Sequence, residues 1–510
     1  MKGRVTMLLD LMMAAFFVLA IGCAALATTY FVDSTGGDDS SGGIGPDAPW
    51  CGLDKVNATT FEPGDKILLK AGCAWSGQLW PKGSGARGDP IVVDMYGEGS
   101  KPAINGGGAV PEAVRLYNQE YWEINNLEVT NHDPAAPAIR SGVRILGEEA
   151  GTLTHVHLKN LEVHDVNGDC HSGRDGGKCN SGILFDVIGE SVKTSFHDVL
   201  IEGCHVYRCD RSGIKTWTDW SRHRGWAPYT KLVIRSNVLD DIGGDGIVAC
   251  MADRPLIEHN TASRCNARSG DWNVAIWVWE TDDAVMQFNE AYLTHTTKDG
   301  QAFDIDGMTR RTVVQYNYSH DNEGGFILLC ESGRPDPGLF NDGSIVRYNI
   351  SQNDGARTFQ VGGKVTNASI YNNTIYVGEG RGDPLMIWHN KDGMWPDHIH
   401  YYSNIFFNLG KGGYDLGKST NNVFDYNVFY GKHPETEPED PHKITDDPRL
   451  VDPGSGGIGR DTVDGYKLRQ DSPCIDSGMT IPDNGGLDYW GNPVPSGSGT
   501  DRGAHEHPGT

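Results

Sequence analysis

Two aspartates, Asp304 and Asp306, stand two positions apart in the segment QAFDID. If this segment is a β-strand, the two side chains share one face and lie about 6.6 Å apart. Carboxyl groups separated by about 6.5–9.5 Å suit inverting hydrolysis of a glycosidic bond, whereas about 5–5.5 Å suits the retaining route. Neighbouring carboxylates also raise one pKa of the pair, which supplies both an acid and a base. We therefore expect Asp304 and Asp306 to carry acid–base chemistry.

Four further titratable side chains are candidates for the same site. Glu280 follows the apolar segment VAIWVW and Glu331 follows GGFILL, so both could border the aspartates from neighbouring strands. His320 and Glu323 lie in YSHDNEGG, where a turn precedes the next strand; His320 could assist proton transfer and Glu323 could be the acid partner. The alternatives are a calcium site, solvated turn carboxylates and a histidine that is only hydrogen-bonded. No cofactor is required, although calcium is possible.

Aromatic side chains accompany these acids. The candidates for substrate binding are Trp217, Trp277, Trp279, Trp388 and Lys215. A soluble protein seldom exposes several tryptophans beside carboxylates without a partner, and indole faces stack on sugar rings. A Trp-lined groove for a glycan is one interpretation. The other is that loops cover this face and the tryptophans form a satellite core.

A short phrase repeats on the strands that must position these residues. We align SGVRIL (141–146), SGILFD (181–186), SGIKTW (212–217), DGIVAC (245–250), VAIWVW (274–279), QAFDID (301–306), GGFILL (324–329) and DPLMIW (383–388). Alternation with period two predicts inward side chains at Ile214, Ile247, Ile276, Phe303, Phe326 and Leu385. It predicts outward pairs at Lys215 and Trp217, Val248 and Cys250, Trp277 and Trp279, Asp304 and Asp306, Ile327 and Leu329, Met386 and Trp388. A slip of one residue would reverse each assignment.

A second phrase places an asparagine after a short apolar strand in each repeat. The recurrent positions are Asn160, Asn237, Asn260, Asn289, Asn317, Asn349, Asn373, Asn404 and Asn427. Their unequal spacing is typical of a solenoid with loops of different length rather than a propeller. An Asn tolerates the left-handed backbone of a turn, and its amide can bond to the Asn of the coils above and below. A β-sandwich would not place Asn at one phase of every repeat.

This pattern resembles the pectin-lyase-like family of right-handed parallel β-helix proteins over about residues 29–430. The opening TYFVDSTGGDDSSGGIGPDAPW with EPGDKILLKAG, and the closing DSPCIDSG with DRGAHE, are similar to the ends of such proteins. The resemblance implies an all-β, right-handed parallel β-helix over 28–432 with a short irregular C-terminal capping segment over 433–510. It also implies a secreted polysaccharide lyase or hydrolase. The motifs typical of polygalacturonases and pectate lyases are not found, so the subgroup stays open.

The N-terminus is typical of an export signal. Lys2 and Arg4 precede an apolar run, and Ala25-Leu26-Ala27 predicts cleavage after residue 27. A lipoprotein signal at Cys23 is the less favoured alternative. The mature protein is expected outside the cytoplasm, secreted or periplasmic, with no membrane span. Export permits disulfides, and the predicted local pairs are Cys170 with Cys179 and Cys51 with Cys73.

The net negative charge of the chain limits the classes of molecule that it can bind. The chain has 68 Asp and Glu against 43 Lys and Arg, and its net charge of −25 makes nucleic acid an unfavourable partner. We predict a monomeric polysaccharide-degrading glycoside hydrolase that uses paired carboxylates in a Trp-lined groove. The first alternative is a polysaccharide lyase for uronic-acid glycans, with Lys215 or an arginine of residues 222–224 as base. The second is a non-catalytic glycan-binding or adhesion solenoid.

Overall fold

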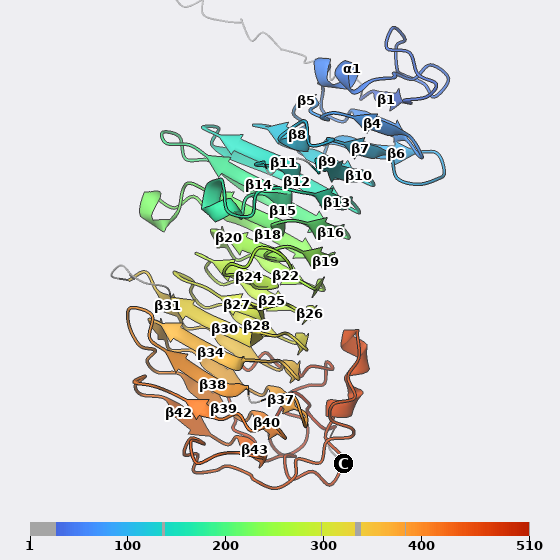
Figure 1. Cartoon of the computed structure of the whole chain (residues 1–510). Coiled ribbons are helices and arrows are strands. Elements are labelled where there is room, and N and C mark those ends of the chain that lie inside the picture. Colours follow the sequence, from blue (N-terminus) through green and yellow to red (C-terminus); the bar gives the residue numbers. More distant parts are fainter. Residues whose placement is uncertain (1–26, 135–137, 297, 332–337, 383, 509–510) are drawn as a thin grey trace, which may run out of the picture.

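The computed structural model describes residues 27–134, 138–296, 298–331, 338–382 and 384–508. In this part of the chain, successive coils of a solenoid add their strands to three long parallel sheets (Figure 1). The predicted right-handed parallel β-helix is confirmed. Residues 1–26 of the predicted export signal, including Cys23, lie outside the described residues. The helices that are described are all too short or too polar to cross a membrane.

Successive coils contribute their strands to the sheets in a fixed order. Sheet 1 contains β1 (Thr29–Val32), β3 (Lys66–Lys70), β6 (Ile91–Tyr96), β9 (Trp122–Asn125), β12 (Thr152–Lys159), β15 (Ser195–Glu202), β18 (Tyr229–Arg235), β21 (Ala252–Asp253), β22 (Leu256–Glu258), β25 (Val285–Gln287), β28 (Val313–Gln315), β32 (Ile345–Arg347), β36 (Ser369–Tyr371), β39 (His400–Tyr402) and β42 (Val423–Asp425). Sheet 2 contains β4 (Ala74–Ser76), β7 (Ala103–Asn105), β10 (Glu128–Asn131), β13 (Glu162–Val166), β16 (His205–Cys209), β19 (Val238–Ile242), β23 (Thr261–Ser263), β26 (Glu290–Tyr292), β29 (Tyr318–His320), β33 (Ile350–Gln352), β37 (Thr374–Val377), β40 (Ile405–Asn408) and β43 (Val428–Gly431). Sheet 3 contains β8 (Glu112–Tyr117), β11 (Ser141–Glu148), β14 (Ser181–Ile188), β17 (Ser212–Thr218), β20 (Ile247–Cys250), β24 (Ile276–Trp279), β27 (Gln301–Ile305), β30 (Gly325–Glu331), β34 (Arg357–Gly363), β38 (Leu385–Asn390) and β41 (Tyr414–Asp415).

The remaining elements are small. Two strand pairs stand apart from the long sheets: β2 (Thr60–Phe61) with β5 (Lys82–Gly83), and β31 (Asn341–Asp342) with β35 (Val365–Thr366). The helices are α1 (Leu53–Ala58) and the 3-10 turns η1 (Arg174–Gly177), η2 (Arg222–Arg224), η3 (Arg460–Thr462) and η4 (Asp464–Tyr466).

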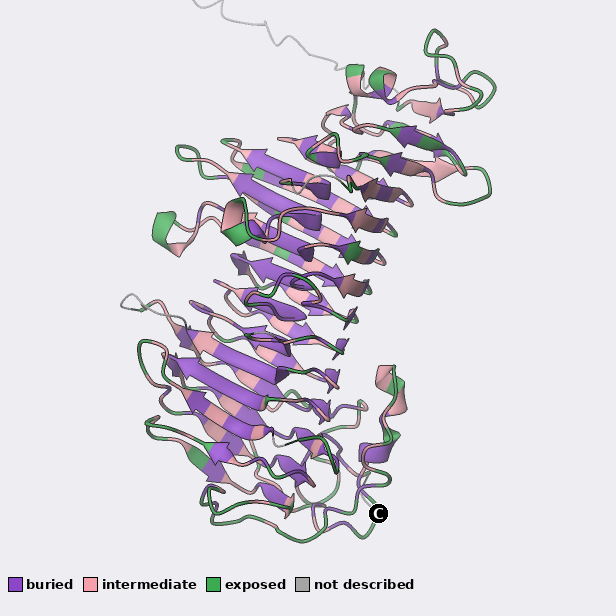
Figure 2. Cartoon of the chain, in the orientation of Figure 1, coloured by how far each residue is buried: buried purple, intermediate pink, exposed green. Residues whose placement is uncertain are grey.

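The hydrophobic core runs along the inside of the coils. Ile247 pairs with Ile276, and Ile276 pairs with Phe303, so side chains at one phase of sheet 3 stack in an apolar column. All three are fully buried. Buried residues continue along the strands of the whole stack (Figure 2). A single coil could not remove these side chains from water, so the stacking itself creates the core.

The register predicted for sheet 3 is correct up to β27, wrong for β30, and wrong for the first two residues of β38. Phe303 pairs with Ile327, so Ile327 and Leu329 point inward instead of outward. Phe326 is also part of the core, because the chain turns a corner between sheets 2 and 3 and two consecutive residues face inside. Period-two counting does not allow for such a corner. In β38, Met386 is likewise in the core, and Leu385 is only half-buried.

The predicted asparagine ladder is present with one exception. Side-chain amides bond from coil to coil at 2.9–3.0 Å through Asn237, Asn260, Asn289, Asn317, Asn349, Asn373, Asn404 and Asn427. The left-handed backbone falls on the residue before the ladder, as at His259 and Phe288, and not on the ladder asparagine. Asn160 occupies that preceding position, with a φ of 55°, and lies outside the ladder. The prediction of a left-handed Asn is therefore wrong for the ladder itself.

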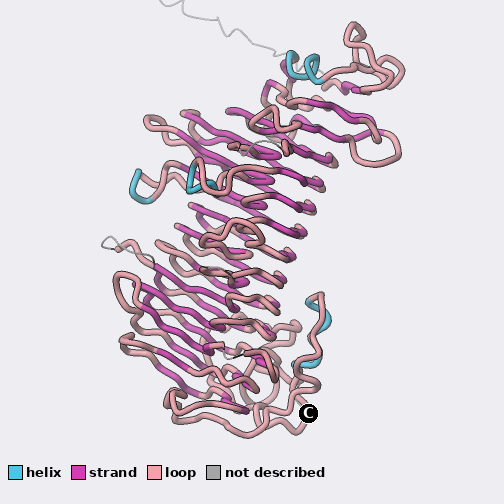
Figure 3. Tube along the Cα trace, viewed as in Figure 1, coloured by secondary structure: helices cyan, strands magenta, loops and turns pink. Residues whose placement is uncertain are grey.

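Both ends of the solenoid are covered. At the N-terminus, α1 buries Leu53 and Val56 against the first coils. Beyond Gly431, the last residue of β43, the chain is mostly loop and returns along the outside of the coils (Figure 3). There the Tyr316 hydroxyl donates to the Leu487 carbonyl at 3.0 Å. Covering the ends and edges in this way prevents strand pairing with other molecules.

The ten described cysteines are all free thiols, so the predicted pairs of Cys170 with Cys179 and Cys51 with Cys73 are not formed. Cys170 and Cys73 donate hydrogen bonds to other groups, to the Asp210 carbonyl and the Asp33 carboxylate respectively. Most of the other thiols are buried in apolar surroundings, where cysteine packs as a small hydrophobic residue.

Candidate active site

Asp304 and Asp306 face outward from sheet 3, as predicted. Asp304 is on β27 and Asp306 directly follows it, while Cys330 of β30 approaches from the next coil. One carboxylate oxygen of each aspartate and the Cys330 sulfur all lie within 4.8 Å of one another. The two carboxyl groups are therefore direct neighbours on this face.

The two aspartates have different surroundings. Asp306 Oδ1 accepts a hydrogen bond from the Gly307 amide at 2.6 Å and another from the Cys330 thiol at 2.9 Å. Asp304 is buried, and its Oδ1 has no hydrogen-bond partner among the described residues. Burial and the neighbouring Asp306 and Asp299 raise the pKa of Asp304 well above its usual value. Burial also raises the pKa of Asp306, but its two donors oppose that rise, so Asp306 is the better anion.

A third carboxyl group, Asp299, was not predicted. It lies in the turn before β27, and burial together with the charge of Asp306 raises its pKa to about 7, although Arg357 opposes the rise. A group with this pKa can donate a proton near neutral pH. The only signal in the sequence is an acid in the turn that leads into the strand carrying Asp304 and Asp306.

Glu331 and Glu280 lie at the end of the same face. Glu331 Oε2 accepts from the Met308 amide at 2.7 Å, and burial, with a smaller effect of Asp306, raises the pKa of Glu331 to about 7. Glu280 Oε2 accepts from the Arg222 amide at 2.8 Å, and burial raises its pKa. The charge of Asp306 thus acts on the Glu331 carboxyl group, whereas Glu280 holds the turn at Arg222 by a hydrogen bond.

The structure does not bring His320 to the aspartates. His320 belongs to β29 of sheet 2, where its ring stacks between Tyr292 and Tyr318 with centroid distances of 4.7 and 4.6 Å. Its Nε2 lies 3.2 Å from Glu290 Oε1, which also accepts from the Gly459 amide of the C-terminal segment. These contacts indicate a packing role under that segment.

Glu323 is also separate from the aspartates. Its Oε1 lies 3.2 Å from His295 Nδ1, and its Oε2 accepts from the Thr296 amide at 2.8 Å. The side chain is about half exposed. Glu323 therefore links two successive turns on the outside of the solenoid. The sequence instead predicts a position beside the groove.

The predicted tryptophans divide into two groups. Trp277 is buried, and its Nε1 donates to Asp245 Oδ1 at 2.9 Å while Lys178 lies 4.7 Å from the ring centroid. It forms part of a small apolar cluster outside the main core, as the alternative interpretation held. Trp217 and Trp279 are half-buried and stack on each other at 5.6 Å. These two rings retain accessible surface beside the acids.

Lys215 is unsuited to act as a base. It is fully buried, and its Nζ donates to Asp175 Oδ2 of η1 at 2.9 Å. Although burial by itself lowers the pKa of a lysine, Asp175 and the neighbouring Cys250 and Cys179 outweigh it and raise the pKa of Lys215. A lysine that keeps its proton cannot abstract one, so Lys215 anchors the η1 loop.

Arg222, from the loop that offered the other candidate bases, is also engaged. Its guanidinium donates to Asp282 Oδ1 at 2.7 Å and to the Met308 carbonyl at 3.0 Å, and it lies over the Trp226 ring. This arginine ties the loop of η2 to the turns beyond β24 and β27.

Trp388 lies on the other side of the acids. The register of sheet 3 places Trp277, Asp304, Leu328, Gln360 and Trp388 on successive coils of one outward row. The Arg357 guanidinium lies 5.6 Å from the Trp388 ring centroid and donates to the Asp299 carbonyl at 3.4 Å. The acids are therefore flanked along the solenoid axis by indole rings on both sides.

The group of Asp304, Asp306 and Cys330 fits calcium poorly. Calcium takes six to eight oxygen ligands, and sulfur is not among the donors it prefers. Burial and the charges of Asp306 and Asp304 raise the pKa of the Cys330 thiol, so it keeps its proton and acts as a donor. The arrangement is better described as a hydrogen-bonded acid cluster.

Comparisons with known proteins agree with the fold. A family model described as "Right handed beta helix region" matches residues 112–290. Lacto-N-biosidase of Bifidobacterium longum subsp. longum is 29% identical in an alignment of 446 residues, and the match covers 69% of this chain and 27% of that protein. This chain thus spans about 27% of the length of that curated relative.

Solved structures give the same likeness. The GH136 lacto-N-biosidase from Eubacterium ramulus, as its selenomethionine derivative, has a TM-score of 0.59 and 27% identity over 71% of this chain and 67% of that chain. The native form has a TM-score of 0.58 and 26% identity over 73% and 68%. The complex of XylC with xylose, at 12% identity and a TM-score of 0.51 over 94% and 98%, shares the fold alone.

Proposed function

We propose that this chain is a glycoside hydrolase whose chemistry is carried by Asp299 and Asp306, with Asp304 between them on the face of sheet 3. The observation that carries the proposal is that Asp304 and Asp306 share the outer face of sheet 3, that Asp299 is near enough to interact with their charges, and that the three carboxyl groups differ in environment. Environments that push the pKa values of nearby carboxyls apart define an acid and a base.

Asp306 acts as the nucleophile or base in this proposal. The Cys330 thiol and the Gly307 amide both favour its ionised form. Asp299 acts as the general acid, because its pKa of about 7 keeps a proton available for the leaving oxygen near neutral pH. Burial and the acidic neighbours raise the pKa of Asp304, so it stays protonated and is available to donate a hydrogen bond to a bound sugar.

The substrate class we propose is a glycan that carries a lacto-N-bioside unit. The likeness to two lacto-N-biosidases supports this choice over other glycans. Trp217 and Trp279 on one side and Trp388 on the other provide ring faces for sugars along the solenoid axis. We also propose that the protein is exported, which the predicted signal over residues 1–27 supports, and that it acts as a monomer.

The test compares wild-type protein with the single variants Asp299→Asn, Asp304→Asn and Asp306→Asn. Asp415→Asn, an exposed acid on β41 of the same sheet, is the control. The substrates are p-nitrophenyl lacto-N-bioside and a natural glycan ending in the same unit, with uronic-acid polysaccharides assayed in parallel by ultraviolet absorbance. Thermal unfolding verifies that each variant is folded.

We expect Asp306→Asn to lose at least about 1,000-fold in kcat/KM on both lacto-N-bioside substrates. Asp299→Asn should lose much more activity on the natural glycan than on the nitrophenyl substrate, because nitrophenolate leaves without protonation. Wild-type activity in both variants would overturn the assignment. Unsaturated products from a uronic-acid polysaccharide would select a lyase, and binding without turnover would select an adhesion solenoid.

A further inference from the structure

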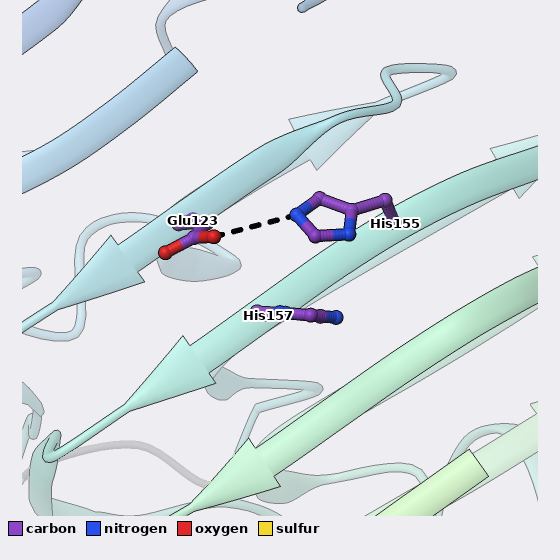
Figure 4. A group of neighbouring side chains, drawn as sticks. All are labelled: Glu123, His155 and His157. Atoms are coloured by element: carbon purple, nitrogen blue, oxygen red, sulfur yellow. Dashed lines mark ion pairs between the residues drawn. The ribbon is translucent and has the colours of Figure 1, made fainter. Parts of the chain in front are cut away.

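A second cluster of titratable side chains lies on the outer face of sheet 1, apart from the acids of sheet 3. Glu123 is on β9, and His155 and His157 are on β12 of the next coil (Figure 4). His157 and Glu123 are direct register partners in neighbouring parallel strands. His155 has a left-handed backbone with a φ of 60°. One ligand atom from each of the three residues lies within 4.8 Å of the others.

The hydrogen bonding of His155 orients it as a metal ligand. Its Nδ1 lies 2.9 Å from Asp198 Oδ2 of β15. Its Nε2 is buried, has no hydrogen-bond partner among the described residues and lies 3.4 Å from Glu123 Oε1. A histidine that binds a metal commonly donates its other ring N–H to a carboxylate, which fixes the tautomer. The Asp198 contact favours the tautomer with a free electron pair on Nε2, facing Glu123.

His157 lies directly beside His155. Its ring centroid lies 3.9 Å from that of His155. Its Nε2 lies 3.3 Å from Asp198 Oδ1, so both imidazoles contact the same carboxylate. A metal ion binds an imidazole through the electron pair of one ring nitrogen.

Two lysines and a surface pocket complete the surroundings. Lys159 Nζ lies 2.9 Å from Glu123 Oε2, and Lys231 Nζ lies 2.8 Å from Asp198 Oδ1. Lys159 contacts Oε2 of Glu123, which leaves Oε1 directed at His155. Asp198 Oδ1 is shared between Lys231 and His157. The adjoining pocket of ≈620 Å³ is lined by Glu123, His155, Asp198 and Lys231, with Arg87 at its rim as a further cation. The pocket gives an ion and a water molecule access from solvent.

From this geometry we propose that Glu123, His155 and His157 bind one zinc ion or a similar divalent transition metal, with the fourth position open to the pocket. Two imidazole nitrogens and one carboxylate oxygen are a donor set that zinc accepts, whereas magnesium and calcium prefer oxygen alone. The ion would join β9 to β12, and Asp198 extends that link to β15. The metal would therefore clamp three successive coils at a distance from the proposed catalytic face.

The first experiment measures Zn²⁺ binding to the metal-stripped chain by competition with a chromophoric chelator. We expect one tight equivalent for the wild type. His155→Gln, His157→Gln and Glu123→Gln should weaken binding by about 100-fold or more, and Asp198→Asn by about 10- to 100-fold. The matched control is His164→Gln, because His164 also lies between two carboxylates, Glu128 and Asp165, but belongs to no group of three metal-ligating side chains among the described residues.

The control must keep wild-type affinity. Absence of a tight equivalent in the wild type, or equal affinity in the wild type and the three ligand variants, would overturn the proposal. Equal weakening by His164→Gln would overturn it too, because the loss would then not be specific to this cluster.

A second measurement uses the unaltered chain, so it does not depend on the variants folding. Diethyl pyrocarbonate modifies accessible histidines, and mass spectrometry locates the adducts. Added Zn²⁺ should protect His155 and His157 but not His197, an exposed neighbour in the same pocket. Equal labelling of His155 and His157 with and without Zn²⁺ would contradict the proposal.

Discussion

The thiol of Cys330 donates a hydrogen bond to Oδ1 of Asp306 across 2.9 Å, from the strand of the next coil. The two residues are 24 positions apart in the chain and meet only because β30 stacks on β27. This contact favours the ionised form of Asp306 and therefore sets the pH at which the proposed nucleophile is available.

Cys330→Ala should move the acidic limb of the pH profile of kcat/KM to higher pH. The loss of the thiol donor raises the pKa of Asp306, so the carboxylate forms only at higher pH. Cys330→Ser keeps a donor at the same place and should retain a limb close to the wild type. Superimposable profiles for the alanine and wild-type proteins would show that the thiol does not tune Asp306.

The stability of the protein should depend on pH through Asp299. Its pKa rises from 3.8 to about 7 on folding, so the folded state holds this proton more tightly than the unfolded state. The resulting stabilisation is complete below about pH 4 and is lost as the pH rises through about 7. Asp299→Asn should remove a pH-dependent contribution of roughly 2–4 kcal/mol from the free energy of unfolding.

Urea unfolding at several pH values between 4 and 8 checks this expectation. The stability of the wild type relative to Asp299→Asn should fall across that interval, and Asp415→Asn should run parallel to the wild type. A difference between wild type and Asp299→Asn that stays constant with pH would contradict the raised pKa.

The asparagine ladder should be a main source of stability. Asn317 donates to the Asn349 side chain and the Met286 carbonyl, and accepts from the side chain of Asn289. Asn317→Ala leaves these buried groups without partners and should cost about 3 kcal/mol or more. Asn160→Gly, outside the ladder at a left-handed position, should change stability by less than about 1 kcal/mol. Equal shifts in the urea midpoint would refute the ladder's special role.

Trp277 and Trp279 should respond differently to substitution. Trp277→Ala removes a buried ring and the hydrogen bond to Asp245, and should cost about 3–5 kcal/mol of stability. Trp279→Ala, in a half-buried ring beside the acids, should raise KM several-fold with a smaller change in thermal stability. Calorimetry and steady-state kinetics on both variants separate the two roles, and a KM unchanged in Trp279→Ala would remove it from the glycan site.

The sequence alone determined the fold and much of the local geometry. Each coil carries its own signals, which are alternating apolar residues and one asparagine per repeat. These local signals predict the solenoid, the apolar column inside it and the outward position of Asp304, because none of them depends on tertiary contacts. Trp388 was likewise placed on the correct face from its strand.

Only the tertiary structure decided which of these outward residues meet and which are covered. Asp299 interacts with Asp306 from the turn before β27, and Cys330 donates a hydrogen bond to Asp306 from the next coil. Asp175 of η1 accepts a hydrogen bond from Lys215 and covers that lysine. The contacts of Cys330 and Asp175 join positions 24 and 40 residues apart, and they depend on how coils of unequal length stack and where loops fold back. The alternation of side chains along one strand says nothing about contacts with other coils or loops. It therefore could not distinguish an acid with a reactive environment from one that is simply buried.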